Sequence, residues 1–333
     1  MKKAEIPVID LHCDLLSFLS DKAGRSPEDP ASRSSYPQLS EGHVKLQTLA
    51  IYGETGKDSL KSGKAQVEWF QRLLTQYPTQ FSPCKLPLKT QSPQVHILPA
   101  FENASTFAGE SEPLSTVFKR LSEYIQAIGP VFYISLTWSH ENRFGGGDQT
   151  NVGLKDDGKR LLEWMHGKKI AIDLSHTSDQ LAHGILNFLE QYSLDIPVMA
   201  SHSNFRAISD YPRNLPNDIA QEIIRRQGLI GLNFFAPFIH KTDPSALLRH
   251  VEYGLSLGGQ NALCFGADFF CASDFSNILT KYQRKEAFYP GLNNSSVYPS
   301  VLAQFAEELS LKEELLLKIA CQNALAFITQ KIL

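Results

Sequence analysis

The sequence of 333 residues is poor in the features that mark several large classes of protein. Cysteine is scarce, and the five cysteines form no C-x-x-C pair: Cys13, Cys84, Cys264, Cys271 and Cys321. An odd, scattered set of this kind indicates neither a disulfide framework nor a thiolate zinc site. A reducing cytoplasm is therefore the expected setting.

Long apolar runs and a basic excess are also missing. No run reaches the roughly 18 apolar residues that a membrane span needs, so we expect no membrane partner. Lys2 and Lys3 are followed by no apolar core before Asp10, so we expect no secretory signal. The formal net charge is −3 without a Lys/Arg cluster, which argues against a nucleic-acid partner. With 42% hydrophobic residues and no break in composition, the chain is expected to form one domain over 1–333, with C-terminal helices from about 298.

Short apolar segments that alternate with helix-period segments are what the chain does contain. The predicted strands are 6–9, 44–52, 95–101, 130–137, 169–174, 196–200, 229–234 and 262–267. The predicted helices are 63–77, 113–128, 154–167, 179–192, 216–226, 244–257, 301–309 and 311–328. This alternation predicts a parallel sheet, and eight such units predict a closed (β/α)8 barrel of the TIM type, with an open doubly wound sheet as the alternative. Residues 21–42 and 78–94 are expected to be loops, and Gly145–Gly147 a flexible loop rather than a phosphate cradle, because no helix follows immediately.

The first strand ends in alternating polar residues. Alternation along a strand sends Asp10, His12 and Asp14 to one side and Leu11 and Cys13 to the other. Three polar groups on one side of an apolar strand are costly to bury unless they are paired, and imidazole and carboxylate are both zinc ligands. We expect Asp10 to orient a ligand histidine rather than to bind metal, and Cys13 to pack in the core.

Later strands end in the same kinds of residue. Glu102, His176, His202 and Asp268 follow strands that would all end on one face of a barrel, where active sites lie. Histidine and carboxylate ligands without thiolates suit catalytic zinc, and more than four candidates suggest two metal ions. From the residues alone, Glu102 can equally be a helix cap and Asp268 a loop carboxylate. The other histidines are predicted to be structural or at the surface: His43, His96, His166, His183, His240 and His250.

Several motifs follow one another in a fixed order from residue 8 to about 275. They are Asp10-Leu11-His12-Cys13-Asp14, Phe101-Glu102, Leu136-Thr137-Trp138, Asp173-Leu174-Ser175-His176, Ser201-His202-Ser203-Asn204, Arg213-Asn214-Leu215-Pro216 and Gly266-Ala267-Asp268-Phe269. In this order they resemble the membrane (renal) dipeptidase family of zinc metallopeptidases. A weaker match continues to the helix around Cys321-Gln322-Asn323.

The resemblance implies a (β/α)8 barrel that binds two zinc ions and hydrolyses dipeptides by a hydroxide bridging them. It also implies roles, in which His12 and Asp14 bind the first zinc, His176 and His202 the second, and Glu102 bridges both, while Asp268 transfers the proton and Arg213 holds the substrate carboxylate. These residue types suit these roles, because two zinc ions lower the pKa of a shared water, a carboxylate can act as general base, and a guanidinium fork matches a carboxylate. Without the resemblance, Arg213 can be a surface arginine beside Asp210.

The chain departs from this family at two positions. Trp138 stands where many relatives have a histidine, and His140 is the nearest imidazole that can replace it. Phe235 stands where an aromatic hydroxyl often occurs, which leaves Asn233 as the nearest polar contact. Trp138, His140 and Asn233 are therefore candidate substrate contacts.

Three functions remain open at this point. The leading hypothesis is a zinc-dependent dipeptidase, with L-Xaa-D-Xaa peptides worth testing because the family tolerates a D-residue at the C-terminal position. The alternative enzyme is an amidohydrolase that acts on N-acyl amino acids or a cyclic amide, and a hypothesis from another class is a non-catalytic barrel that only binds its ligand. The resemblance also allows a homodimer.

Overall fold

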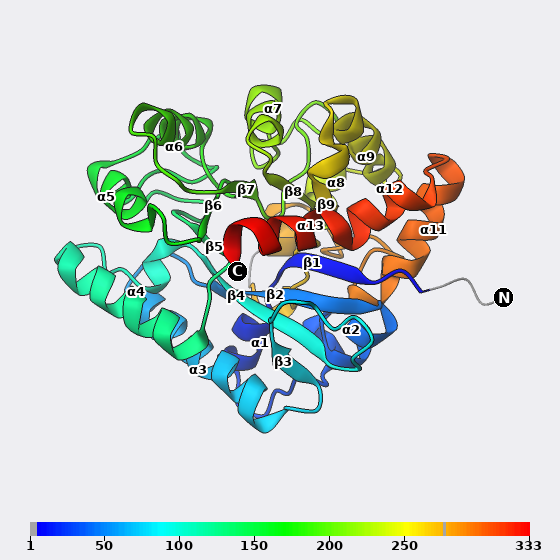
Figure 1. The fold of residues 1–333 in the computed structure, drawn as a ribbon, viewed down its shortest axis with the longest axis horizontal. Coiled ribbons are helices and arrows are strands. Elements are labelled where there is room, and N and C mark those ends of the chain that lie inside the picture. Colours follow the sequence, from blue (N-terminus) through cyan, green and yellow to red (C-terminus); the bar gives the residue numbers. More distant parts are fainter. Residues whose placement is uncertain (1–4, 276–277) are drawn as a thin grey trace.

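Parallel strand pairing closes the sheet into a barrel in the computed structural model, which describes residues 5–275 and 278–333. The strand order is β2-β1-β9-β8-β7-β6-β5-β4-β3, and a further pairing of β2 with β4 closes the ring (Figure 1). The strands are Val8–Cys13 (β1), Val44–Tyr52 (β2), Phe81–Pro83 (β3), Val95–Glu102 (β4), Tyr133–Ser135 (β5), Ala171–Asp173 (β6), Val198–Ala200 (β7), Leu229–Leu232 (β8) and Leu263–Phe265 (β9). The predicted (β/α)8 barrel is confirmed and the open sheet is excluded. Lys2 and Lys3 lie outside the described residues.

Helices surround the ring of strands (Figure 1). They are Leu15–Asp21 (α1), Tyr36–Glu41 (α2), Ser59–Gln76 (α3), Leu114–Ile128 (α4), Asp156–Met165 (α5), Asp179–Gln191 (α6), Asn217–Arg225 (α7), Ala236–Ile239 (α8), Ala246–Ser256 (α9), Ile278–Lys281 (α10), Tyr298–Glu308 (α11), Glu313–Leu317 (α12) and Asn323–Phe327 (α13). The stretches Lys318–Gln322 and Ile328–Ile332 continue the last helix as π-helical turns. Within the described residues, no helix has both the length and the apolar content that a membrane span requires.

Two segments predicted as loops contain regular structure. Residues 21–42 include α2, whose start is fixed by Gln38, because Oε1 of Gln38 accepts a hydrogen bond of 3.1 Å from the backbone N–H of Ser35. Residues 78–94 include β3, which pairs in parallel with β4 alone and stands outside the closed ring. Both elements are too short to produce a detectable hydrophobic period, which is why the sequence pattern misses them.

The interior of the barrel is a core of its own. Ile9 and Leu11 of β1 pack there with side chains from the other barrel strands, together with Phe327 and Ile328 of the C-terminal helix. Asn323 of the same helix donates hydrogen bonds to the carbonyl oxygens of Gln260 and Leu263, at the start of β9. The C-terminal helix therefore closes the end of the barrel at which the strands begin. We call this end the floor and the opposite end, where the strands terminate, the mouth.

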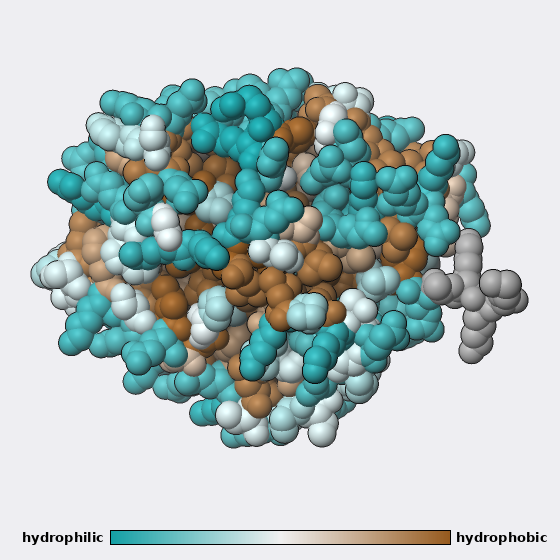
Figure 2. Space-filling view, in the orientation of Figure 1, coloured by the Kyte–Doolittle hydropathy of each residue, from teal (hydrophilic) through white to brown (hydrophobic). Residues whose placement is uncertain are grey.

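The floor is the face turned toward the viewer in Figure 1, where α13 crosses in front of the strands. Apolar residues gather in the middle of this face and hydrophilic residues surround them (Figure 2). The second buried cluster fills the layer between the strands and the outer helices. The polar residues at the strand ends are thus separated from solvent on the floor side by the whole barrel core.

Candidate metal centre

Residues from five strand ends meet at the mouth of the barrel. His12 belongs to β1 and Asp14 follows it, Glu102 is the last residue of β4, and His176, His202 and Asp268 follow β6, β7 and β9. All six side chains are buried or nearly so. The structure therefore brings together every residue that the sequence analysis assigned to metal binding or proton transfer.

Glu102 lies at the centre of this cluster. Its Oε2 is 3.3 Å from Nε2 of His12, while its Oε1 is 3.0 Å from Nε2 of His176 and 3.5 Å from Nε2 of His202. The two Nε2 atoms of His176 and His202 are 3.1 Å apart. One carboxylate oxygen thus faces one histidine and the other oxygen faces a pair, so each oxygen has imidazole nitrogens beside it with which it could share a cation.

The donor atoms of the cluster fit a divalent cation. Nε2 of His12, Oδ1 of Asp14 and Oε2 of Glu102 are buried, and among the described residues none of these atoms has a hydrogen-bond partner. Buried polar atoms without partners are costly, and a metal ion would satisfy all three. Among the described residues, two groups of three side chains each bring their ligand atoms within 4.8 Å of one another. The first group is His12, Glu102 and His202, and the second is His12, Asp14 and Asp268.

Each of two histidines is held from behind by a hydroxyl of a residue in, or directly after, a barrel strand. Nδ1 of His12 is 2.6 Å from the hydroxyl of Tyr133 on β5, and that hydroxyl donates to the carbonyl oxygen of Leu11. Nδ1 of His202 is 2.7 Å from Oγ of Ser201, which donates to the carboxylate of Asp173. Since each hydroxyl donates onward, it can accept the Nδ1 proton of the imidazole, which leaves Nε2 of each ring, facing Glu102, as the atom available to a cation.

The third histidine has its outer partner on a loop. Nδ1 of His176 is 3.4 Å from Oδ1 of Asp148, and the backbone N–H of Asp148 donates to the carbonyl oxygen of His176 over 2.9 Å. Burial would raise the pKa of Asp148, but contact with His176 and the charge of Arg213 outweigh it and lower this pKa below its ordinary value. The triple glycine precedes Asp148 directly in a loop, as predicted, and its residues are buried rather than exposed at the surface.

Charged groups are crowded in the cluster, and this crowding shifts the pKa values of its members. Burial lowers the pKa of His12, but the carboxylates of Glu102, Asp268 and Asp14 outweigh it and raise this pKa to about 10. Burial and the negative charges of Glu102 and Asp268 raise the pKa of Asp14 well above its usual value. Burial and His12 lower the pKa of His202 well below its usual value. Three carboxylates this close repel one another, so a bound cation would relieve the repulsion.

Asp268 is held in place by an amide. Burial raises its pKa to about 6 against the opposing effect of His12. Asn233 donates one amide hydrogen to Oδ2 of Asp268 over 2.9 Å and the other to the carbonyl oxygen of His202 over 3.1 Å, and its own oxygen accepts from the N–H of Phe235. Both amide hydrogens are thus used inside the protein. The prediction that Asn233 contacts substrate is not supported, because its hydrogen bonds position Asp268 instead.

Two of these residues have unusual backbone conformations. His176 has φ +66° and Asp268 has φ +63°, in the left-handed region that non-glycine residues rarely adopt. Strain of this kind persists only where the surrounding structure enforces it, and it concentrates at functional sites.

Arg213 lies beside the cluster as a buried cation. Only 4% of its surface is exposed, and its guanidinium donates to Oγ of Ser203 and to the carbonyl oxygen of His202. Among the described residues, no carboxylate lies within 4.0 Å of it and its Nε has no hydrogen-bond partner. A buried guanidinium without a paired anion is suited to bind one. This position excludes the reading of Arg213 as a surface arginine.

A cavity of about 380 Å³ opens onto the cluster. Asp14, Glu102, His176 and Asp268 line it from below, and Tyr52, Trp138, His140, Phe235 and Tyr282 line its walls. Trp138 packs against Tyr52 and against His176, with ring centroids 5.3 and 5.8 Å apart, and His140 is exposed at the rim. The size suits a small ligand rather than a polymer.

Asp10 does not point toward the mouth with His12. Oδ1 of Asp10 accepts from the backbone N–H groups of His12 and Ala267, and its other oxygen accepts from the hydroxyl of Tyr298 on α11. The pairing of β1 with β2 shifts register between Asp10 and Cys13, which breaks the alternation assumed from the sequence. Asp10 therefore fixes the backbone of His12 and does not orient an imidazole, whereas Cys13 packs in the outer core as expected.

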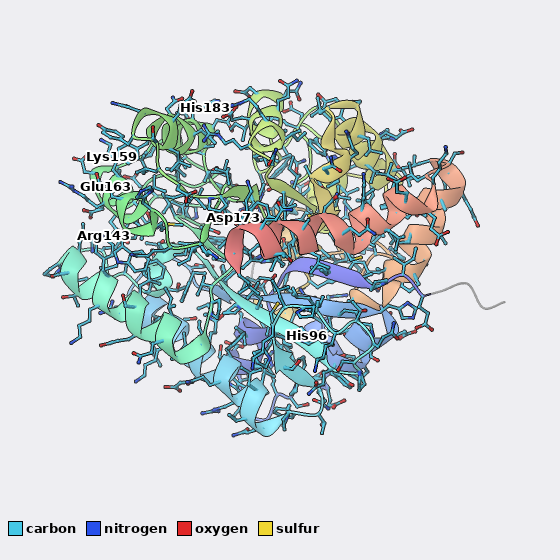
Figure 3. The ribbon with its side chains drawn as sticks, viewed as in Figure 1. His96, Arg143, Lys159, Glu163, Asp173 and His183 are labelled. Carbon is cyan, nitrogen blue, oxygen red and sulfur yellow. The ribbon has the colours of Figure 1, made fainter. Side chains whose placement is uncertain are left out.

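Other histidines have structural contacts away from the mouth. His250 is buried between the carbonyl oxygen of Ile239 and the N–H of Phe205, and His183 pairs with Asp218 at the molecular surface. His183 thus lies at the rim of the molecule, away from Asp173, which lies within the ring of strands and accepts from Ser201 behind His202 (Figure 3).

Sequence reasoning missed the outer partners of the histidines: Tyr133, Ser201, Asp173 and Asp148. The Ser-His pair repeated at 175–176 and 201–202 is a signal that could have pointed to Ser201. No spacing connects Asp148 to His176, because the contact depends on how the glycine loop folds.

Comparison with known proteins places this barrel in a family. Residues 3–331 match the family model described as membrane dipeptidase, peptidase family M19. An uncharacterised dipeptidase of Schizosaccharomyces pombe is 24% identical, and the alignment covers 96% of this chain and 79% of that protein.

Solved structures share the fold. A metallopeptidase of Rhodobacter sphaeroides, crystallised with a phosphinate mimic of the dipeptide L-Ala-D-Ala, superposes with a TM-score of 0.80 at 20% identity, covering 98% of this chain and 99% of the other. A probable dipeptidase of Pseudomonas aeruginosa superposes with a TM-score of 0.75 at 16% identity, covering 97% and 94% of the two chains.

Proposed function

Because the chain belongs to the membrane dipeptidase family, peptidase family M19, we propose that it is a zinc-dependent dipeptidase with two ions per chain. The observation that carries this proposal is the position of Glu102, with one carboxylate oxygen 3.3 Å from His12 and the other 3.0 Å from His176. This geometry supports a carboxylate that bridges two cations.

Histidines and carboxylates divide naturally between the two ions. His12 and Asp14, which end β1, would hold the first zinc; His176 and His202 would hold the second; and Glu102 would bridge both. The buried, unpartnered atoms of His12, Asp14 and Glu102 support this assignment. The absence of thiolates from the cluster fits a catalytic rather than a structural site. Zinc ions held in this way polarise a carbonyl group and lower the pKa of water.

Asp268 is the residue we assign to proton transfer. Its carboxylate lines the cavity and is 3.7 Å from Nε2 of His12. In this role it takes a proton from the attacking water and returns it to the leaving amine, as a positioned general base does. Asn233 keeps the carboxylate in place by donating to its Oδ2.

The substrate is a dipeptide with a free C-terminal carboxylate, which Arg213 would bind. Trp138 and His140 line the cavity and would contact the rest of the substrate. The complex of the Rhodobacter sphaeroides enzyme with an L-Ala-D-Ala mimic makes L-Xaa-D-Xaa peptides the first to test here. We also propose that residues 1–333 form one catalytic domain with C-terminal helices from about 298. The cytoplasmic setting and the homodimer stay predictions.

Elemental analysis of the untreated protein and a substrate panel together test the proposal. We expect close to two zinc ions per chain and hydrolysis of L-Xaa-L-Xaa or L-Xaa-D-Xaa dipeptides, with loss of activity on chelation and recovery when zinc is restored. N-acyl amino acids and cyclic amides serve as the comparison. Activity on those compounds alone would establish the amidohydrolase alternative, and tight binding without turnover would establish the non-catalytic one.

A further inference from the structure

The three histidines of the metal centre differ in what supports them from behind. Tyr133 and Ser201 support His12 and His202 over 2.6 and 2.7 Å. Nδ1 of His176 faces a carboxylate oxygen of Asp148 at 3.4 Å. Both of these atoms are buried, and neither has a hydrogen-bond partner among the described residues. Nδ1 of His176 and Oδ1 of Asp148 are therefore free to form a hydrogen bond with each other.

We propose that Asp148 is a positioning residue that holds the His176 ring so that its Nε2 faces the second zinc. This inference rests on the proposed function, because it concerns the ligand set of that site. A carboxylate behind a ligand histidine accepts the Nδ1 proton, fixes the tautomer and makes Nε2 a stronger donor to the metal. A cation on Nε2 would make the Nδ1–H a stronger hydrogen-bond donor, which would favour a shorter contact with Asp148.

The chain conformation around Asp148 is built for this contact. The N–H of Asp148 donates to the carbonyl oxygen of His176 over 2.9 Å, and the N–H of Ser178 donates to the carbonyl oxygen of Gly146, also over 2.9 Å. These bonds join the two loops on either side of the carboxylate–imidazole contact. The carboxylate is thus held by backbone pairing rather than by chance proximity of two side chains.

Gly147 shows why the loop needs glycine next to Asp148. A Cβ atom at this position would lie 1.8 Å from the carbonyl oxygen of Trp138 and 2.3 Å from the carbonyl carbon of Ser139. Any other residue would push the backbone away and carry Asp148 with it. Glycine therefore lets the loop pass close to the backbone of Trp138 and Ser139, which explains the glycine next to Asp148.

Arg143 fixes the far side of the same loop. Its Nε donates to Asp157 on α5 over 2.8 Å, and its Nη1 donates to the carbonyl oxygen of Glu112 over 2.8 Å. Arg143 lies near the edge of the molecule between α4 and α5 (Figure 3). The loop therefore spans from the outer helices to the mouth and is anchored at both ends.

Zinc affinity of variants tests the proposal directly. Wild type, Asp148→Asn, Asp148→Glu and the control Asp210→Asn are titrated with zinc against a competing chelator. Asp210 is a suitable control because it lines the same small side cavity as Asp148 but is exposed and has no contact with a histidine of the cluster. In Asp148→Asn we expect one of the two zinc affinities to fall about 10–100-fold and the other to stay within about twofold. Asp148→Glu should recover part of the loss, and Asp210→Asn should match the wild type.

A purely structural role predicts a different pattern. It would lower the melting temperature of the metal-free protein and weaken both ions alike, whereas positioning of His176 weakens one ion and leaves the metal-free melting temperature unchanged. Equal loss at both sites, or two wild-type affinities in Asp148→Asn, would overturn the proposal. If the wild type itself binds fewer than two ions, the proposed function fails instead, and the two failures are distinguishable.

The wild-type protein supplies an independent measurement if the variant does not fold. With ¹⁵N-labelled histidine in the zinc-loaded protein, we expect His176 to show a slowly exchanging, downfield Nδ1 proton, assigned by its loss in His176→Gln. A His176 ring that carries its proton on Nε2, or an Nδ1 proton that exchanges freely with water, would contradict the contact with Asp148.

Discussion

The two ends of the barrel are built from the same strands and have opposite chemistry. At the floor, Ile9 and Leu11 of β1 pack with Phe327 and Ile328 of the C-terminal helix in an apolar core. At the mouth, one residue further along the same strand, His12 belongs to a cluster of imidazoles and carboxylates. Burial of apolar surface at the floor stabilises the fold, whereas burial of charged groups at the mouth destabilises it. Each strand that ends at the cluster therefore contributes to stability at its first residues and to the metal centre at its last residues or directly after them.

The largest expected effect is at the mouth. Replacing Asp268 with Asn should lower kcat by about 10²–10⁴-fold, because the amide cannot accept the proton that a general base takes. The bound zinc and the melting temperature should stay at wild-type values, which elemental analysis and thermal unfolding measure. Loss of one zinc ion along with activity would show instead that Asp268 is a metal ligand, as its place beside His12 and Asp14 also permits.

The reverse experiment is made at the floor. Phe327 is 4% exposed and its ring lies 6.2 Å from that of Phe132. Phe327→Ala should reduce the free energy of unfolding by about 3 kcal/mol, because it leaves a cavity in the interior core. Denaturant unfolding measures this loss, and kcat/KM per folded molecule should not change. A fall in kcat/KM without a fall in stability would mean that the floor affects the chemistry at the mouth, so that the two ends are not separate.

A smaller effect distinguishes buried histidines inside and outside the mouth. Burial lowers the pKa of His250 to about 4, against an ordinary value of 6.5, and carboxylates raise that of His12 to about 10. For His250 the unfolded chain binds the proton more readily than the folded one, so its contribution is complete above pH 6.5 and is lost as the pH falls toward 4. Between pH 7 and pH 5 we expect a loss of roughly 2 kcal/mol of stability that is absent in His250→Gln. Identical pH dependence in wild type and variant would contradict the assignment.

The smallest effect is expected at the outer wall of the cavity. Trp138→His places an imidazole where Trp138 now packs on Tyr52 and His176. A donor facing the cavity should raise kcat by a few-fold through contact with the substrate carbonyl group, without changing metal content. Trp138→Phe is the control and should leave kcat near the wild-type value. A rise in Trp138→Phe as large as that in Trp138→His would indicate that relief of bulk, and not the imidazole, is responsible.

Much of the barrel can be predicted from the sequence because its strands are buried on both faces. Val44–Tyr52 and Val95–Glu102 appear as apolar runs, and the amphipathic helix that includes Gln66 and Phe70 separates them. Strand ends in a parallel barrel lie on one face, so His12, Glu102 and His202 can be grouped without coordinates.

Other parts of the site depend on geometry that no residue pattern encodes. The register shift in β1 interrupts the simple alternation, so the residue pattern cannot show that Asp10 lies on a different side of the strand from His12. The hydrogen bonds of Asn233 to Asp268 and His202 join segments far apart in the sequence, so the sequence alone does not reveal that both of its amide hydrogens are used inside the protein. Asp148 was missed because its place behind His176 is set by the backbone path of a loop.

The pairing of β1 with β9 limits when the metal centre can form during folding. Asp10 accepts a hydrogen bond from Ala267, 257 positions away, and the N–H of Asp268 donates to the carbonyl oxygen of His12. Joining segments so distant is entropically expensive, and topologies of this kind fold slowly. His12 and Asp268 become neighbours only when β1 and β9, from opposite ends of the chain, have paired. A chain in which these strands have not paired would therefore offer a metal ion no finished binding site, and metal binding would report that the polypeptide has reached its native topology.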